Sequence, residues 1–252
     1  MSGHSKWASI KHKKGAADAK RGKLFTKLIR EITVAARNGG GKTETNARLR
    51  LAIQRAKDAN MPQGNIERSV KKGTGELEGV NYEEVIYEGY GPGGIAIMVE
   101  VLTDNKNRAS SVIRNIFAKK GGNMAGQGSV NWMFEKKGYI VINKSETEED
   151  KLMDIALDAG AEDLKAEDTT YAVTVLPSDF DKVKKAIADN KIKIEADEIT
   201  NVPKNTIKVT GDDAKKVLSL VNELEDNDDV QNVYANFDIP DDILKELEGT
   251  TG

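Results

Sequence analysis

The chain has 252 residues, of which 38% are hydrophobic and 23 are glycine, so it is long enough for two or three domains with real cores. It contains no cysteine, which excludes a disulfide scaffold, a thiolate zinc site and a cysteine nucleophile, and suits a reducing compartment. No apolar run approaches the roughly 20 residues of a membrane span, and no hydrophobic signal core opens the sequence. We therefore expect a cytoplasmic protein without a membrane partner.

Charge is distributed very unevenly along the chain. Residues 1–72 hold 18 Lys and Arg against 5 Asp and Glu, a net charge of +13, whereas the remainder has a net charge of −16. Such asymmetry is typical of a protein whose basic part meets a polyanion, and nucleic acid is the first candidate. Two other interpretations stay open, namely a solvated charged surface and a basic domain that docks on the chain's own acidic part.

The first 19 residues are predicted to form a basic arm, because Gly3 and Gly15 interrupt them and their apolar residues have no helical spacing. The arm either follows phosphates as a tail or lies against a later domain, with Trp7 and Ile10 as anchors. Its lysines are candidate phosphate contacts, and they are Lys6, Lys11, Lys13 and Lys14.

Residues 20–38 have the period of an amphipathic helix. Their cations recur at gaps of 3, 4, 3 and 7, which places them on one stripe of a helix. This cationic stripe consists of Lys20, Lys23, Lys27, Arg30 and Arg37. The apolar face on the other side consists of Leu24, Phe25, Leu28, Ile29 and Ile32. The helix therefore has one face to bury and a cationic face left over for a partner.

Two shorter helices are predicted to follow, the second of them anchored by Ile66 and Val70 and ending at Gly73. Residues 44–60 place a leucine, an isoleucine and several alanines at helical spacing, and Arg48 and Arg55 flank one side of that face as further candidate phosphate contacts. Met61–Pro62 ends this helix, because the residue before a proline disfavours the helical conformation. Three short helices with brief connections favour a small bundle, so residues 1–76 are predicted to form a basic arm and a three-helix domain.

No stretch supports a nucleotide cofactor or catalysis. Ala36–Thr43 has the loose spacing of a phosphate loop, but a helix rather than a buried strand precedes it. Gly89–Gly94 lies between two strand patterns, which predicts a hairpin turn. Carboxylates lie on solvated stretches, and neither His4 nor His12 has a partner set for a metal or a triad. We expect no enzyme activity, no cofactor, no metal and no small-molecule substrate.

From Tyr82 onward the period changes from helical to alternating, and Val130–Phe134 is one of the predicted strands. Residues 138–200 give the order β-α-β-β-α-β, the split βαβ order of ferredoxin-like domains. The segments on either side have too few strands to cover themselves, so we expect them to join. The predicted fold class is α+β with three domains. They are the helical domain, a discontinuous α/β domain of residues 77–135 plus 204–240, and an inserted ferredoxin-like domain of residues 136–203.

Several stretches together resemble the YebC/PmpR family. They are Gly3–Trp7, Lys23–Ile32, Asn60–Pro62, Tyr87–Gly94, Leu102–Asn105 with Asn107–Arg108, and Gly128–Val130. The resemblance starts at Met1, which leaves no room for an organelle transit peptide and favours a bacterial cytoplasmic protein. It implies a helical domain with two ferredoxin-like domains, and a role in gene expression. Some members of the family are described as DNA-binding transcriptional regulators, and others, including the mitochondrial activator of cytochrome c oxidase subunit I synthesis, act in translation on the ribosome.

We therefore expect a non-enzymatic nucleic-acid-binding regulator of gene expression. The expected phosphate contacts are Lys6, Lys11, Lys13, Lys14, Lys20, Lys23, Lys27, Arg30, Arg37, Arg48 and Arg55. With about six phosphates engaged, log K should fall against log salt with a slope of about −5. Phosphate contacts position a protein without reading sequence. Only Asn38 and Gln54 are candidate base readers, and no clear recognition helix contains them.

DNA and the ribosome stay alternative targets. A typical operator reader is a symmetric dimer, and this chain shows no dimerisation heptad. A basic end on a three-domain chain also suits a ribosomal RNA cleft, where Tyr90 is a candidate for base stacking. A third class, an adaptor that binds other proteins through the acidic ferredoxin-like domains, also stays open because fold does not fix function.

Overall fold

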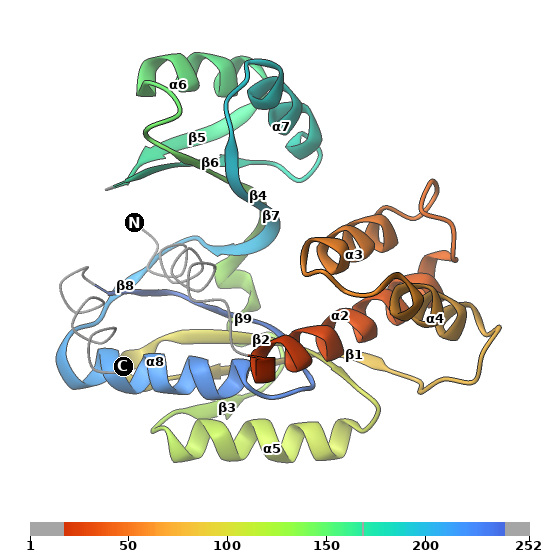
Figure 1. The fold of residues 1–252 in the computed structure, drawn as a ribbon. Helices are drawn as coiled ribbons and strands as arrows, with labels where there is room; N and C mark the ends of the chain where they lie inside the picture. The colour runs from red at the N-terminus through yellow and green to blue at the C-terminus, as the bar shows by residue number, and fades with distance from the viewer. Residues whose placement is uncertain (1–17, 168, 240–252) are drawn as a thin grey trace. The chain divides into compact units, whose positions relative to one another are not determined.

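The computed structural model describes residues 18–167 and 169–239. The chain divides into two compact units (Figure 1). One unit is Trp132–Thr206, and the other comprises the described residues before Trp132 and after Thr206. The predicted boundary between a helical domain and an α/β domain near residue 76 stays a prediction. Within the described residues, no helix combines the length and the apolar character that crossing a membrane requires.

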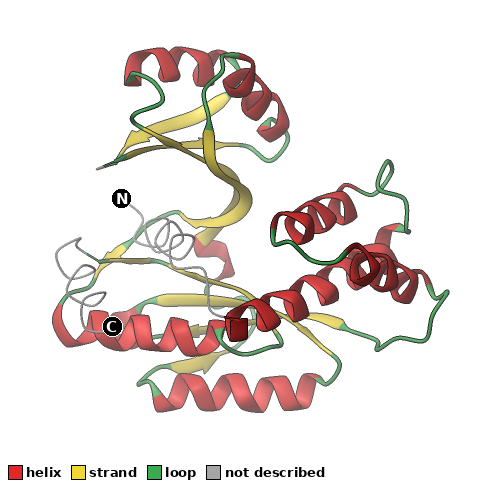
Figure 2. Cartoon of the chain, in the orientation of Figure 1, coloured by secondary structure: helices red, strands yellow, loops and turns green. Residues whose placement is uncertain are grey.

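Three helices open the described chain and pack on one another (Figure 2), as predicted. They are α2 (Asp18–Gly39), α3 (Ala47–Asp58) and α4 (Gln63–Thr74). Their shared core includes Ile32, Leu49 and Ile66, each at most 2% exposed. The buried Asn46 begins α3, because its side-chain oxygen accepts a hydrogen bond from the Leu49 amide at 3.0 Å.

One residue of the predicted apolar face of α2 is not buried. Leu24 is 45% exposed, whereas Leu28 and Ile32 are buried as expected. The reason is length. Helix α2 has 22 residues while α3 and α4 have 12 each, so the two shorter helices cover only part of its apolar face.

The same unit contains a four-stranded antiparallel sheet in the order β3-β1-β2-β9. Its strands are β1 (Glu83–Tyr90), β2 (Ala96–Thr103), β3 (Asn123–Ala125) and β9 (Val230–Ala235). Segments from both sides of Trp132–Thr206 therefore share one sheet. The sequence predicts a hairpin turn at Gly89–Gly94, and the chain does turn there between β1 and β2, with the 3-10 turn η1 (Pro92–Gly94) in the connection.

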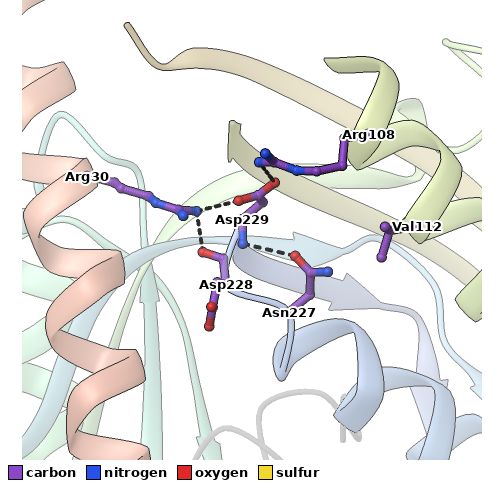
Figure 3. Close-up of a pocket in the computed structure, with 6 residues that line it drawn as sticks. All are labelled: Arg30, Arg108, Val112, Asn227, Asp228 and Asp229. Atoms are coloured by element: carbon purple, nitrogen blue, oxygen red, sulfur yellow. Dashed lines mark hydrogen bonds and ion pairs between the residues drawn. The ribbon is translucent and has the colours of Figure 1, made fainter. Parts of the chain in front are cut away.

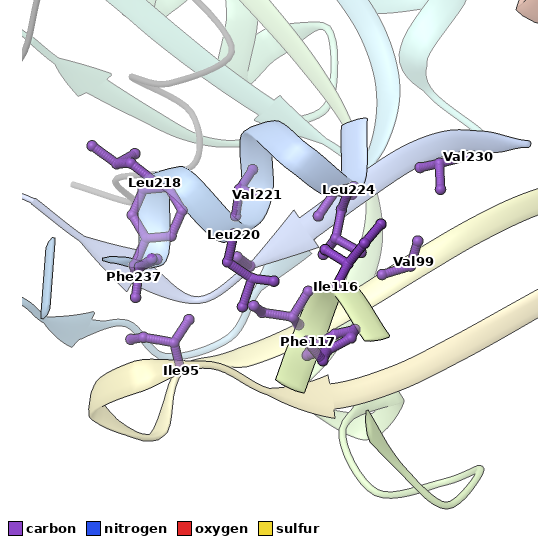
Figure 4. Close-up of a cluster of buried hydrophobic side chains, with 14 of the residues drawn as sticks. Ile95, Val99, Ile116, Phe117, Leu218, Leu220, Val221, Leu224, Val230 and Phe237 are labelled. Carbon is purple, nitrogen blue, oxygen red and sulfur yellow. The ribbon is translucent and has the colours of Figure 1, made fainter. Parts of the chain in front are cut away.

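Two helices cover one face of this sheet. They are α5 (Lys106–Lys119) and α8 (Gly211–Glu225), and the core between helices and sheet includes Ile95, Phe117 and Leu220 (Figure 4). All three of these side chains are fully buried. A separate parallel pair is formed by β8 (Ile207–Lys208) and β10 (Phe237–Asp238).

The unit Trp132–Thr206 has the predicted β-α-β-β-α-β order. Its elements are β4 (Phe134–Asn143), α6 (Glu149–Asp158), β5 (Ala161–Ala166), β6 (Thr170–Val175), α7 (Phe180–Asp189) and β7 (Ile194–Pro203). The antiparallel sheet has the order β5-β6-β4-β7, which is the ferredoxin-like arrangement. Helices α6 and α7 pack on one face around Ile140, Leu152 and Val183, each fully buried.

The prediction of a strand at Val130–Phe134 is wrong for most of its length. The segment forms a loop and the 3-10 turn η2 (Asn131–Met133), and only Phe134 belongs to a strand. The physical reason is Glu88 on β1, a carboxylate that is 2% exposed. It accepts the backbone amides of Gly128 at 2.8 Å, Val130 at 2.6 Å and Asn131 at 2.9 Å, so these amides are not free for a ladder.

The contribution of Glu88 to the free energy of unfolding is expected to depend on pH. Burial alone would raise the pKa of Glu88, but the backbone amides outweigh it and hold the pKa below its ordinary value. We expect Glu88→Gln to lower the free energy of unfolding by about 1–3 kcal/mol at neutral pH, because the new NH₂ group would face amide donors. A lowered pKa adds stability above the unfolded-state pKa of about 4, and this stability is lost as the pH falls through the folded value.

Urea unfolding of wild type and Glu88→Gln between neutral and acidic pH tests this expectation. The difference in unfolding free energy between the two proteins should narrow below about pH 4. Glu83→Gln is the matched control on the same strand. Its side chain is 50% exposed and pairs with Lys106, so the variant should lose at most about 1 kcal/mol. Equal losses in the two variants would contradict the role given to Glu88.

Candidate nucleic-acid interface

The cationic stripe of α2 reaches the turn between α8 and β9, Glu225–Asp229, which we call the acidic turn. Lys27 Nζ donates to the Glu225 carbonyl at 2.6 Å. Lys23 Nζ donates to the Asp226 carbonyl at 3.2 Å and lies 3.5 Å from its carboxylate. The last carbonyls of a helix lack intrahelical donors and form the negative end of its dipole. Helix α8 has no basic residue in its own last turn, so the lysines of α2 supply the missing donors.

Arg30 makes the most buried of these contacts. Its Nη1 atom lies 2.7 Å from the Asp229 carboxylate, and the two side chains are 13% and 12% exposed. The same nitrogen donates to the Asp228 carbonyl at 2.5 Å (Figure 3). It also donates to the Leu102 carbonyl at 3.2 Å. The guanidinium thus joins α2 to the acidic turn and to the end of β2.

The second Asp229 oxygen completes the network, because it accepts from Arg108 and from Thr103 Oγ1, each at 2.9 Å. Burial opposes the ionisation of Asp229, but the hydrogen bonds from Arg108, Thr103 and Arg30 outweigh burial and hold its pKa below the ordinary value. A depression of about 300 Å³ lies here, lined by both arginines and by Asp228 and Asp229. Its positive charges are therefore compensated within the chain.

Arg37 and Arg48 are engaged in the same way. The Arg37 guanidinium donates to the side chain of Asn81 and, at 3.1 Å, to the Val80 carbonyl. Arg48 forms ion pairs of 2.8 Å with Glu31 on α2 and with Glu84 on β1. These two arginines tie the helices to the segment that enters β1. The sequence predicted a cationic face left over for a partner. The members of the stripe whose side chains the structure describes are bonded within the chain, and they are Lys23, Lys27, Arg30 and Arg37.

A second set of cations on α3 and α4 has no side-chain hydrogen bond or ion pair to any described residue. Its members are Arg55, Lys57, Arg68 and Lys71, which are exposed, and Lys72, which is half-buried. We call this set the open cations. Only Arg55 belongs to the predicted contacts. Among the others, Lys6, Lys11, Lys13 and Lys14 lie outside the described residues, and so does the side chain of Lys20.

Comparison with known proteins identifies the family. Residues 5–76 match the family model described as the TACO1/YebC protein N-terminal domain, and residues 82–237 match the TACO1/YebC second and third domain. The chain belongs to the TACO1/YebC family. This agrees with the observed three-helix region followed by two antiparallel α/β sheets.

Relatives of this TACO1/YebC protein match it over nearly the full length. A protein of Desulfatibacillum aliphaticivorans is 60% identical, and one of Dictyoglomus turgidum is 59% identical. Each match covers 98% of this chain and 100% of the relative, and each relative is named a probable transcriptional regulatory protein. A solved structure of a conserved hypothetical protein from Aquifex aeolicus has a TM-score of 0.79 at 50% identity, covering 90% of this chain and 94% of that chain.

Sequence reasoning missed the cations of α4 in this family member. Arg68, Lys71 and Lys72 have i, i+3, i+4 spacing, which places them on one face of the helix. The only acid within α4 is Glu67, which accepts a hydrogen bond from Gln63 at 3.1 Å. The signal was present as three closely spaced cations without an acid to match them.

The candidate base-contacting residues are engaged within the chain. Asn38 donates to Glu84 at 3.1 Å, and Gln54 donates to Asp58 at 2.8 Å. The hydroxyl of Tyr90, the stacking candidate, donates to the Ser129 carbonyl at 3.1 Å, and the residue is half-buried on β1. Within the described part of the chain, no group of His, Asp and Glu is arranged to hold a metal ion.

Proposed function

We propose that this TACO1/YebC protein is a non-enzymatic regulator of gene expression that binds nucleic acid in the cytoplasm through its helical region. The observation that carries the proposal is the set of open cations on α3 and α4. Binding to a polyphosphate is driven by release of its counterions, and a cation that is already paired within the protein contributes little to that release. Open cations are therefore the groups best suited to take phosphates.

The contacts of the stripe support this choice of surface. Moving Lys27 to a phosphate would take a donor from the Glu225 carbonyl, and moving Arg30 would take one from the Asp229 carboxylate, so each move has a free-energy cost. The arm lysines Lys6, Lys11, Lys13 and Lys14, with Lys20, extend the surface in this proposal. The remaining predicted cations mainly hold the helical region against the acidic turn and the segment that enters β1 in this proposal. They are Lys23, Lys27, Arg30, Arg37 and Arg48.

Duplex DNA is the first candidate ligand, because the relatives are named as probable transcriptional regulatory proteins. Structured RNA on the ribosome is the second. It is favoured by the internal bonds of Asn38 and Gln54, since a surface that contacts phosphates without reading bases suits RNA shape as well as DNA.

Fluorescence anisotropy with a labelled DNA duplex and a labelled RNA hairpin tests the proposal. With about five phosphates engaged, log K should fall linearly with log salt, with a slope of about −4 to −5, between about 50 and 200 mM salt. Ribosome co-sedimentation at low and high salt then distinguishes ribosomal RNA from DNA as the ligand. Absence of binding to both probes at low salt, or binding that does not respond to salt, would contradict the proposed function.

A further inference from the structure

A small depression lies between α2 and α4, with a volume of about 160 Å³. Ile29 of α2 lines it on one side, and Asn65, Arg68, Ser69 and Lys72 of α4 line the other. Sites for whole small molecules have volumes of about 300–1,000 Å³. This depression is therefore too small for a nucleotide or a cofactor, but it has room for a single tetrahedral anion.

The charges around this depression all have one sign. Arg68 and Lys72 are both open cations, and among the described residues no carboxylate lines the depression. The depression at Asp229 is also lined by two cations, Arg30 and Arg108, but two aspartates line it with them. The two sites thus differ in the property that decides anion binding, which is whether the positive charge is already compensated.

Lys72 is held in place although its ammonium group has no described partner. Its aliphatic stem lies against Gly79, where an added Cβ would be 3.1 Å from Lys72 Cβ and 3.3 Å from Cγ. A stem packed in this way loses less rotamer freedom when the charged end binds a ligand. Arg68, one turn earlier on the helix, supplies a planar fork of donors that matches a phosphate bidentately.

We infer that this depression is a site for one backbone phosphate of the bound nucleic acid. Arg68 binds two phosphate oxygens, Lys72 supplies a point charge, and Ile29 provides an apolar wall against which the adjoining sugar lies. The inference rests on the proposed function and deepens it, because it distinguishes one built phosphate site from the diffuse attraction of the other open cations.

The test measures binding of the same DNA and RNA probes to a double variant, Arg68→Gln with Lys72→Gln. The matched control is Lys215→Gln with Lys216→Gln, which removes the same charge from two exposed lysines of α8 that have no described partner. We expect the α4 variant to reduce the steepness of the salt slope by about 2 and the affinity at least about tenfold at 0.1 M salt, and the control to change neither measurably.

The outcomes separate this site from the proposed function. If the two double variants weaken binding equally, the attraction is diffuse and the site is overturned while the proposed function stands. If the α4 variant keeps the wild-type slope, the site is likewise overturned. If wild type binds neither probe, the proposed function and the site both fail.

Arg68→Lys should keep the salt slope while losing part of the affinity, since it retains the charge without the planar fork of donors. Circular dichroism of each variant confirms that it is folded.

Discussion

Replacing Asp229 with alanine is expected to lower the free energy of unfolding by about 3 kcal/mol. The carboxylate is 12% exposed and is bonded to Arg30, Arg108 and Thr103, so its removal takes one acceptor from each of these three donors. Breaking a buried ion pair from one side is costly, because the remaining charge stays desolvated and unpaired. The loss should appear in urea unfolding followed by circular dichroism.

Asp228→Ala is the matched control for this prediction. Asp228 is adjacent, exposed and equally charged, but Arg30 uses its backbone carbonyl rather than its carboxylate. The control therefore removes the same charge from the acidic turn while keeping the hydrogen bond, and it should change stability by less than about 0.5 kcal/mol. Similar losses for the two variants would show that general charge, and not the network around Asp229, sets the effect.

The Asp229 effect should also depend on pH. The folded-state pKa of Asp229 is lowered, so its stabilisation is complete above the unfolded pKa of about 4 and is lost as the pH falls through the folded value. The difference between wild type and Asp229→Ala should therefore be full at neutral pH and narrow below about pH 4. A difference that stays constant into acid would contradict the assignment of the effect to the ionised carboxylate.

Gly73→Ala is expected to have the second large effect, a loss of about 3 kcal/mol of unfolding free energy. A Cβ at this position would meet the Thr33 carbonyl oxygen and lie 2.6 Å from Ala36 Cβ, both on α2. Neither atom is at the end of a flexible side chain, so α4 would have to move away from α2. The movement would also separate Arg68 and Lys72 from Ile29, and nucleic-acid binding should weaken with stability.

Gly64→Ala is the control for this prediction, because it lies on the same helix and its added Cβ would meet nothing within 4 Å. Alanine is the better helix former, so this variant should gain up to about 1 kcal/mol. Urea unfolding measures both changes. If Gly73→Ala is as stable as wild type, the tight packing of α4 on α2 is not what holds the helical region together.

Much of the fold could be predicted from local pattern. The period of 3.6 residues located α2 to α4, and alternation located most of the strands. The failures have nonlocal causes. Val130–Phe134 has the composition of a strand, but Glu88, more than 40 positions earlier, takes its amides. Leu24 has the spacing of a buried residue, but the helices that would cover it are too short.

The candidate site was harder to predict than the fold. The sequence showed a net positive charge in residues 1–72 and a net negative charge in the rest, and it left docking between the two parts as an open alternative. It could not show that Lys27 and Arg30 meet the acidic turn, because the contact spans 198 and 199 positions. The sequence prediction chose the most regular stripe of cations, and that regularity belongs to a surface bonded within the chain.

The sequence by itself determined the fold class of this protein. Periodicity, the order of strands and helices, and the separation of charge depend on neighbours along the chain, and they were sufficient for an α+β fold with a basic helical end. Only the tertiary structure decided which cations are compensated and which are open. Ion pairing depends on distances between segments remote in sequence, and Coulomb energy falls with those distances, so no local pattern contains it.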